Sequence, residues 1–245
     1  MKFIPVKLKE NPNEIHSYIK SSNKIKIANY FHWMAIKYAA NLVEPSGGMV
    51  TEIGCGEGYL IPTLSKHFDK VVGVDKSEKM LNSAKKFFHF ANVFYLIDNI
   101  AAPHHLQLIE ERYNWVICLE TLEHIPQWDI ALNNMFRMLL PGGRILLSIP
   151  VEIGFPLLIK EIARYFSYGK GSGWQWNNFI RKVIGSKRKI NRENYGSHMG
   201  FDYREVIDFI NKIPYIKINH ISFFPINSKY FGLRVYIVAQ KNKPG

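Results

Sequence analysis

The sequence predicts an α/β fold in which a doubly wound parallel sheet carries helices on both faces. Short apolar runs recur between Met49 and Ile149, and each is about as long as one buried strand. Stretches with apolar residues at helical spacing separate these runs, and turns that contain Gly or Pro divide one unit from the next. Strands that alternate with helices in this way form a parallel sheet, because each helix crosses over one of its faces.

The predicted elements follow in a simple order along the chain. They are a helix at Asn29–Val43, a strand at Met49–Ile53, a helix at Tyr59–Phe68, strands at Val71–Asp75 and Val93–Ile97 with a helix between them that Ser77 caps, a strand at Trp115–Leu119, a helix at Asp129–Leu140, and a strand at Arg144–Ile149 after the Pro141-Gly142-Gly143 turn. Beyond them we expect a helix from Asp202 to about Lys212 and strands at Ile216–Phe224 and Leu233–Gln240.

A basic segment interrupts this alternation. The chain has 245 residues, of which 47% are hydrophobic, and a formal net charge of +12. Between Leu157 and Arg192 there are nine Lys or Arg residues and one acid, Glu161. Aromatic residues such as Trp174 and Trp176 are too frequent there for a disordered linker. We therefore expect residues 151–199 to form a cap inserted after the fifth strand.

A glycine loop follows the first predicted strand, in the sequence Glu52-Ile53-Gly54-Cys55-Gly56-Glu57-Gly58. Glycine tolerates positive φ and lets a ligand approach the backbone, so the loop predicts an adenosine-type binding site. The dinucleotide fingerprint requires its last glycine one position later, where this chain has Tyr59, and a pyrophosphate site is therefore not favoured. Asp75, at the end of the second strand, could accept both ribose hydroxyls, and Asp98 could face the adenine amine.

Four motifs in this order resemble those of class I S-adenosylmethionine-dependent methyltransferases, in the branch that acts on small molecules, quinone precursors and lipids. The resemblance covers roughly residues 45–150 and implies a seven-stranded sheet in the order 3-2-1-4-5-7-6 with the last strand antiparallel. The cofactor would be S-adenosyl-L-methionine and the product S-adenosyl-L-homocysteine. The motifs are Glu52–Gly58, Val72–Asp75, Cys118–Ile125 and Leu140–Gly143.

The resemblance also implies which residues would hold the cofactor. Glu52 would hold its amino group, directly or through water, and Asp75 would hold its ribose. Met80 would pack on the adenine, unless it is simply a core residue. The full set of implied binding residues is Glu52, Gly54, Cys55, Gly56, Gly58, Asp75, Lys76, Met80, Asp98, Asn99, Leu119 and Glu120.

Methyl transfer requires mainly the alignment of the acceptor with the methyl group, and a base only where the acceptor arrives protonated. His124, after the fourth strand, is the candidate base; it could instead order its loop through hydrogen bonds. Glu120 is a second candidate, and His198 could approach from the cap. Tyr30, His32 and Trp33 could form a lid or pack in the core. We expect no metal.

The whole chain, 1–245, is predicted to be one methyltransferase domain. It would comprise an N-terminal helical region (1–44), a cofactor-binding core (45–150), the cap (151–199) and a C-terminal helix with strands (200–245). The acceptor would be a small or lipid-like molecule; a nucleic-acid acceptor bound by the basic cap, or a non-catalytic binding protein of the same fold, are the alternatives. Two distant cysteines and the lack of an apolar leader predict a cytoplasmic protein, whose cap could contact an anionic membrane from the inner face.

Overall fold

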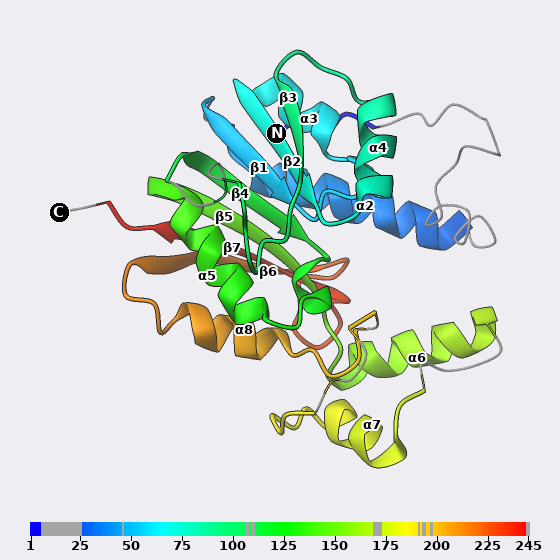
Figure 1. The fold of residues 1–245 in the computed structure, drawn as a ribbon. Coiled ribbons are helices and arrows are strands. Elements are labelled where there is room, and N and C mark those ends of the chain that lie inside the picture. Colours follow the sequence, from blue (N-terminus) through cyan, green and yellow to red (C-terminus); the bar gives the residue numbers. More distant parts are fainter. Residues whose placement is uncertain are drawn as a thin grey trace.

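The computed structural model describes residues 1–5, 26–45, 47–105, 108, 111–168, 173–190, 192, 195–196 and 198–243. Its centre is a seven-stranded sheet with the order β3-β2-β1-β4-β5-β7-β6 (Figure 1). β7 runs antiparallel to both of its neighbours, β5 and β6, and the other neighbouring pairs of strands are parallel; the predicted fold class is confirmed. The strands are β1 (Met49–Ile53), β2 (Lys70–Asp75), β3 (Val93–Ile97), β4 (Tyr113–Leu119), β5 (Leu139–Pro150), β6 (Ile216–Phe224) and β7 (Arg234–Lys241).

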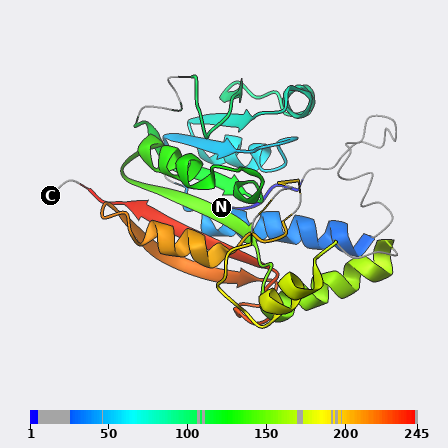
Figure 2. The same cartoon turned by 60° about the horizontal axis from the view of Figure 1, so that its bottom comes forward.

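Helices cover both faces of the sheet (Figure 1). One face carries α2 (Lys26–Leu42), α3 (Ile61–His67) and α4 (Glu78–Phe87), and the other carries α5 (Trp128–Met138) and α8 (Tyr203–Ile210). The remaining helices, α6 (Gly154–Tyr168) and α7 (Trp176–Val183), lie together beyond the end of β5 rather than on the sheet, as Figure 2 shows from another side.

Strand residues alternate between two hydrophobic cores, as the two-residue period of a strand requires. In β5, Ile145 and Leu147 pack in the core under α5 and α8, whereas Leu146 packs in the core under α2 and α3. The hydroxyl of Tyr236 donates a hydrogen bond of 2.9 Å to the carbonyl of Ala35 and so fastens α2 to β7. The central strands β1, β2 and β4 are therefore buried along most of their length, and the ends of these strands are the place for a ligand.

The boundaries of β1, β3 and β6 agree with the predicted ones, and Ser77 and Asp202 cap α4 and α8 through their side chains as predicted. The predicted turn before the fifth strand is wrong. The segment Pro141-Gly142-Gly143 lies inside β5, and α5 ends at Met138. Tyr113 of β4 pairs with Leu139 of β5, and Trp115 pairs with Arg144. Between these two pairs β5 has more residues than β4, so the regular pairing of the two strands is interrupted there.

Charged side chains attach the cap segment to the rest of the fold. The Nζ of Lys182 in α7 lies 3.2 Å from the carboxylate of Asp202, and both side chains are buried. Within the cap segment itself, Lys160 and Arg164 of α6 lie 2.9 Å and 3.6 Å from the buried Glu152. Part of the predicted basic surface is therefore internal structure.

Two parts of the predicted organisation lie outside the described residues. They are residues 6–25 of the N-terminal helical region and Lys170 of the basic segment. Within the described part of the chain, no helix combines the length and the apolar character needed to cross a membrane. The division into four segments stays a prediction.

Candidate functional site

A cavity of about 640 Å³ opens beyond the ends of β1, β2 and β4. Its walls come from the glycine loop, from the loops after β2, β3 and β4, and from Tyr195, Gly196 and His198. A volume of this size suits one or two small organic molecules. The predicted site residues that line it are Gly54, Cys55, Gly56, Asp75, Lys76, Met80, Asp98, Asn99, Leu119, Glu120 and His124.

The glycine loop has positive φ at Gly54 (69°) and Gly56 (53°), but the two glycines differ in their surroundings. A Cβ at Gly54 would lie 2.2 Å from the hydroxyl oxygen of Thr121, so Gly54 is required by the close approach of the loop after β4. A Cβ at Gly56 would meet no protein atom within 4 Å. The open space beside Gly56 belongs to the cavity, where a ligand can touch the backbone.

Asp75 braces the loop from the end of β2. Its Oδ2 accepts a hydrogen bond of 2.9 Å from the amide of Gly56, and its Oδ1 accepts one of 2.8 Å from the amide of Ser77. Each carboxylate oxygen has a second lone pair, and the residue lines the cavity. Asp75 can therefore both shape the loop and accept hydroxyl groups of a ligand.

Glu52 lies beneath the loop and lines an adjoining cavity of about 120 Å³ together with His32, Tyr59 and Arg234. Its side chain is buried, and its Oε2 has no hydrogen-bond partner among the described residues. Burial, and then the charge of Asp75, raise the pKa of Glu52 to about 8. A buried carboxyl group with a raised pKa favours the binding of a cationic ligand group, because the positive charge would stabilise the ionised form of Glu52.

His32, from α2, lies on the other side of this small cavity. Burial, and then the charge of Arg234, lower the pKa of His32 to about 4. Trp33 packs edge-on against Tyr59, with ring centroids 5.3 Å apart, and Tyr30 is exposed. These contacts place His32 at the cavity and Trp33 in the packing behind it.

Asp98 mainly orders the loop that follows β3. It accepts hydrogen bonds from the amides of Asn99, His104 and His105, and its Oδ2 lies 2.7 Å from the Nδ1 of His105. Burial alone would raise the pKa of Asp98, but these hydrogen bonds lower it to about 2. Most of its hydrogen-bonding capacity is therefore used inside the protein, a role that the sequence did not indicate.

Glu120 follows β4 in an unusual backbone conformation, with φ of 48°. Its Oε1 accepts a hydrogen bond of 2.8 Å from Ser148, and its Oε2 lies 3.0 Å from the Nε of Arg234. Burial would raise the pKa of Glu120, but the charge of Arg234 and the Ser148 hydrogen bond lower it. Both carboxylate oxygens of Glu120 thus face hydrogen-bond donors. Glu120 is therefore better suited to holding Arg234 in place than to accepting a proton.

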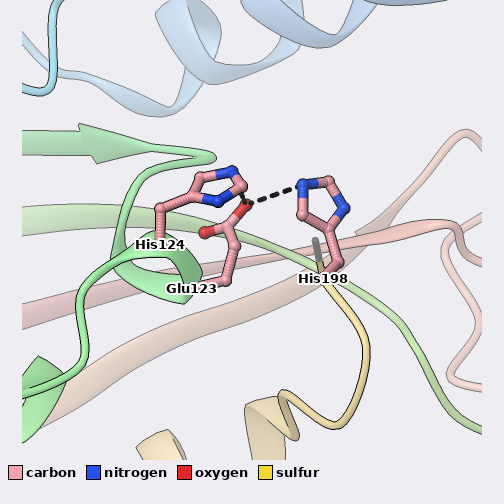
Figure 3. Close-up of side chains that lie close together, drawn as sticks. All are labelled: Glu123, His124 and His198. Atoms are coloured by element: carbon pink, nitrogen blue, oxygen red, sulfur yellow. Dashed lines mark ion pairs between the residues drawn. The ribbon is translucent and has the colours of Figure 1, made fainter. Parts of the chain in front are cut away.

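At the cap end of the cavity, His124 and His198 converge on the carboxylate of Glu123 (Figure 3). The Oε1 of Glu123 lies 3.9 Å from the Nε2 of His124 and 3.7 Å from the Nε2 of His198. Glu123 is fully buried, and burial, with the nearby charge of Glu120, raises its pKa well above the usual range. Burial also lowers the pKa of His124, although a hydrogen bond of 2.7 Å to the carbonyl of Tyr195 opposes this.

The structure brings together almost all the predicted site residues. Gly58 lines neither cavity; a Cβ there would lie 3.2 Å from Ile61 and Phe88, so it serves packing. The sequence did not identify Arg234 or Glu152 as site residues, because no motif surrounds either residue in the chain. Thr121 was also missed, although it stands inside a motif that the sequence analysis used.

Comparisons with known proteins agree on one family. Residues 51–147 match the model of the methyltransferase domain family. A ubiquinone biosynthesis O-methyltransferase from Coxiella burnetii is 30% identical over 129 residues, which cover 52% of this chain and 54% of that protein. One from Pseudomonas fluorescens is 26% identical over 133 residues. This chain therefore spans about half the length of the curated relatives that it matches.

Solved structures show the same fold over most of the chain. An S-adenosylmethionine-dependent methyltransferase from Mesorhizobium loti has a TM-score of 0.58 at 16% identity, covering 86% of this chain and 97% of that one. The N-methyltransferase NodS from Bradyrhizobium japonicum, in complex with S-adenosyl-L-homocysteine, has a TM-score of 0.54 at 12% identity and covers 94% and 95%. At these identities the likeness concerns the fold.

Proposed function

We propose that this chain, whose residues 51–147 match the methyltransferase domain family and whose relatives include O-methyltransferases, is a class I S-adenosylmethionine-dependent methyltransferase that methylates an oxygen of a small or lipid-like acceptor. One observation carries the proposal: a single cavity joins the glycine loop and Asp75 to His124 and His198 of the cap end. A methyl donor and an acceptor could therefore meet inside one cavity. The curated relatives with O-methyltransferase names support oxygen as the accepting atom.

The residues around the glycine loop fit S-adenosylmethionine. Gly56 leaves open space at the backbone, and the orphaned, buried carboxylate of Glu52 suits the ammonium group of the cofactor. Asp75 would accept the ribose hydroxyls, while Lys76, Met80 and Asn99 would border the adenosine. When bound, the cofactor supplies a methyl group activated by a positively charged sulfur. The protein aligns the acceptor with that group and excludes water.

Removing the carboxylate of Asp75 tests the cofactor assignment. Asp75→Ala should weaken the binding of S-adenosylhomocysteine by at least about 100-fold, because two hydroxyl hydrogen bonds and the brace of Gly56 are lost together. Isothermal titration calorimetry measures this, with Asp69→Ala, an acid at the opposite end of β2, as the matched control. Unchanged affinity in Asp75→Ala would contradict the assignment.

The acceptor class is tested by supplying candidates with labelled S-adenosylmethionine. Hydroxylated aromatic and prenylated phenols should accept the label, whereas transfer RNA and duplex DNA should not. The basic residues of the cap give the nucleic-acid alternative its only support here, and Lys160, Arg164 and Lys182 among them face buried acids. Label in nucleic acid alone would replace the proposed acceptor, and cofactor binding without any transfer would favour a binding protein.

A lipid-like acceptor would be met at a membrane surface, and the cap has suitable exposed residues. Phe166 of α6 is 83% exposed, Trp176 of α7 is 72% exposed, and Ile184 is 74% exposed. Arg181, Lys187 and Arg188 are exposed beside them. Apolar and basic side chains on neighbouring helices suit the interface of an anionic bilayer.

Flotation with phosphatidylglycerol vesicles tests this contact. The wild-type chain should float in low salt and be released in high salt, and Phe166→Ser combined with Trp176→Ser should abolish flotation. Ile130→Ser, a change at an exposed residue of α5, is the matched control. Equal flotation of all three proteins would contradict the proposed membrane contact of these cap residues. It would not affect the proposal of methyl transfer.

A further inference from the structure

We infer that Glu123, His124 and His198 form a binding site for a divalent transition-metal ion at the cap end of the cavity. Each offers one ligand atom, and these three atoms all lie within 4.8 Å of one another. Two imidazoles and one carboxylate are a ligand set of catalytic zinc sites and of open iron sites. As Figure 3 shows, both rings lie beside the Glu123 carboxylate.

The buried carboxylate is the first observation in favour of a cation. Both oxygens of Glu123 are buried without a hydrogen-bond partner in the described part of the chain. An ionised carboxylate in that position is costly unless a positive charge compensates it. The histidines face it at 3.7 Å and 3.9 Å, which is too long for hydrogen bonds. A tetrahedral ion with bonds of about 2.1 Å holds its ligand atoms about 3.4 Å apart, so only a small closure is needed.

The surroundings of the two imidazoles are the second observation. The Nδ1 of His124 lies 2.7 Å from the carbonyl oxygen of Tyr195, so Nδ1 carries the proton and the lone pair of Nε2 points toward Glu123. The Nδ1 of His198 faces the carboxylate of Glu152 at 3.8 Å, while its Nε2 faces Glu123. Metal-binding histidines are oriented in this way, with the far ring N–H directed at a carbonyl or a carboxylate.

A shared proton explains this arrangement less well than a metal ion. A proton can bridge two of the three converging atoms, and only at a shorter separation than the structure has. An ion contacts all three at once. The positive side chains around the cluster have hydrogen-bonded or ion-pair contacts of their own: Lys160 and Arg164 contact Glu152, Arg234 contacts Glu120, and Arg192 donates to the backbone carbonyl of Glu123. The charges of Arg234 and Lys160 also act on the Glu123 carboxylate, and burial outweighs them.

The metal site would act on the methyl acceptor. This part of the inference rests on the proposed function. With three protein ligands, a tetrahedral ion keeps a fourth position, which the acceptor hydroxyl can take. The ion weakens the O–H bond, and the proton leaves to a water molecule at the cavity mouth. A lone pair of the oxygen then forms the new bond to the methyl carbon, and the electrons of the broken carbon–sulfur bond remain on sulfur. His124 thereby becomes a metal ligand rather than the predicted proton acceptor.

Metal binding is measured first without any acceptor. Calorimetry with Zn²⁺, and the visible spectrum of Co²⁺ bound to the chelator-treated protein, should show one site per chain with the absorption of a four-coordinate ion. His198→Gln should weaken binding at least about 100-fold, and Glu152→Gln, which acts through His198, about tenfold. His220→Gln, on exposed strand β6, is the matched control.

Two results would overturn the inference: a wild-type chain that binds neither ion at one site, or His198→Gln binding them as tightly as wild type. Because His198 is partly exposed, its variant should remain folded, which thermal denaturation verifies. Removing the metal with a chelator should also abolish methyl transfer without changing the affinity for S-adenosylhomocysteine. If the wild type methylates no hydroxyl acceptor yet binds one ion, the proposed function fails and the metal site stands.

Discussion

The glycine-loop end of the cavity and its cap end are assembled from different kinds of sequence. At the glycine-loop end, Glu52, Gly54, Gly56 and Asp75 come from two adjacent strands and the turns that follow them. At the cap end, Glu123, Glu152 and His198 come from three segments joined by buried charge pairs and backbone hydrogen bonds. The first end depends on local backbone geometry, and the second on long-range electrostatics. Substitutions at the two ends should therefore reduce stability and ligand binding for different physical reasons.

A large effect on stability is expected at the glycine-loop end. Gly54→Ala should destabilise the fold by about 3 kcal/mol, because positive φ costs about 1 kcal/mol and the new Cβ would overlap Thr121. Gly56→Ala has the same backbone strain without the overlap, and should cost about 1 kcal/mol while weakening cofactor binding. Urea denaturation measures both. Equal losses of stability would contradict the different roles given to the two glycines.

The cap end should respond to the loss of a single buried charge. Asp202→Asn keeps a good N-cap for α8 but leaves Lys182 buried beside a neutral side chain, which should cost about 3 kcal/mol. Asp208→Asn removes the exposed partner of Lys187 and should cost less than about 0.5 kcal/mol. Urea denaturation of the two variants compares them; similar small losses would show that charge pairing does not hold the cap.

At the glycine-loop end, Glu52 should also affect the stability of the fold, and this effect should change with pH. Because the folded pKa of about 8 is above the unfolded value of 4.5, the unfolded chain releases this proton first, and stability falls as pH rises between these values. Glu52→Gln cannot ionise, so its stability relative to wild type should increase from pH 5 to pH 8. The gain should be no more than about 1.4 kcal/mol per pH unit.

Thermal denaturation of both proteins at the two pH values, without cofactor, measures this difference. The same variant should bind S-adenosylhomocysteine more weakly at pH 8, since the compensating carboxylate is gone. A stability difference that is constant with pH would mean that Glu52 is ionised throughout, as an acid in contact with water would be.

The same contrast explains what could be predicted from the sequence. Gly54, Asp75 and Ser77 act on residues close to them along the chain or at the same register of the sheet, so a motif is sufficient to place them. Arg234 meets Glu120 only because β7 inserts antiparallel beside β5. Glu152 and His198 lie at the two ends of the cap segment and meet only after the cap has folded. The turn at Pro141-Gly142-Gly143 was misplaced because a glycine pair signals a break equally well inside a strand, where pairing with β4 resumes at Arg144.

Product analysis tests the central claim most directly, that the two ends of the cavity work as one methyltransferase site. The purified chain is incubated with labelled S-adenosylmethionine and a hydroxylated aromatic acceptor, and the products are identified by mass spectrometry. We predict an O-methylated product from wild type, none from Asp75→Ala, which fails to bind the cofactor, and none from His198→Gln, which still binds it. Full product formation by His198→Gln, or cofactor bound by wild type with no product from any hydroxyl acceptor, would contradict the claim.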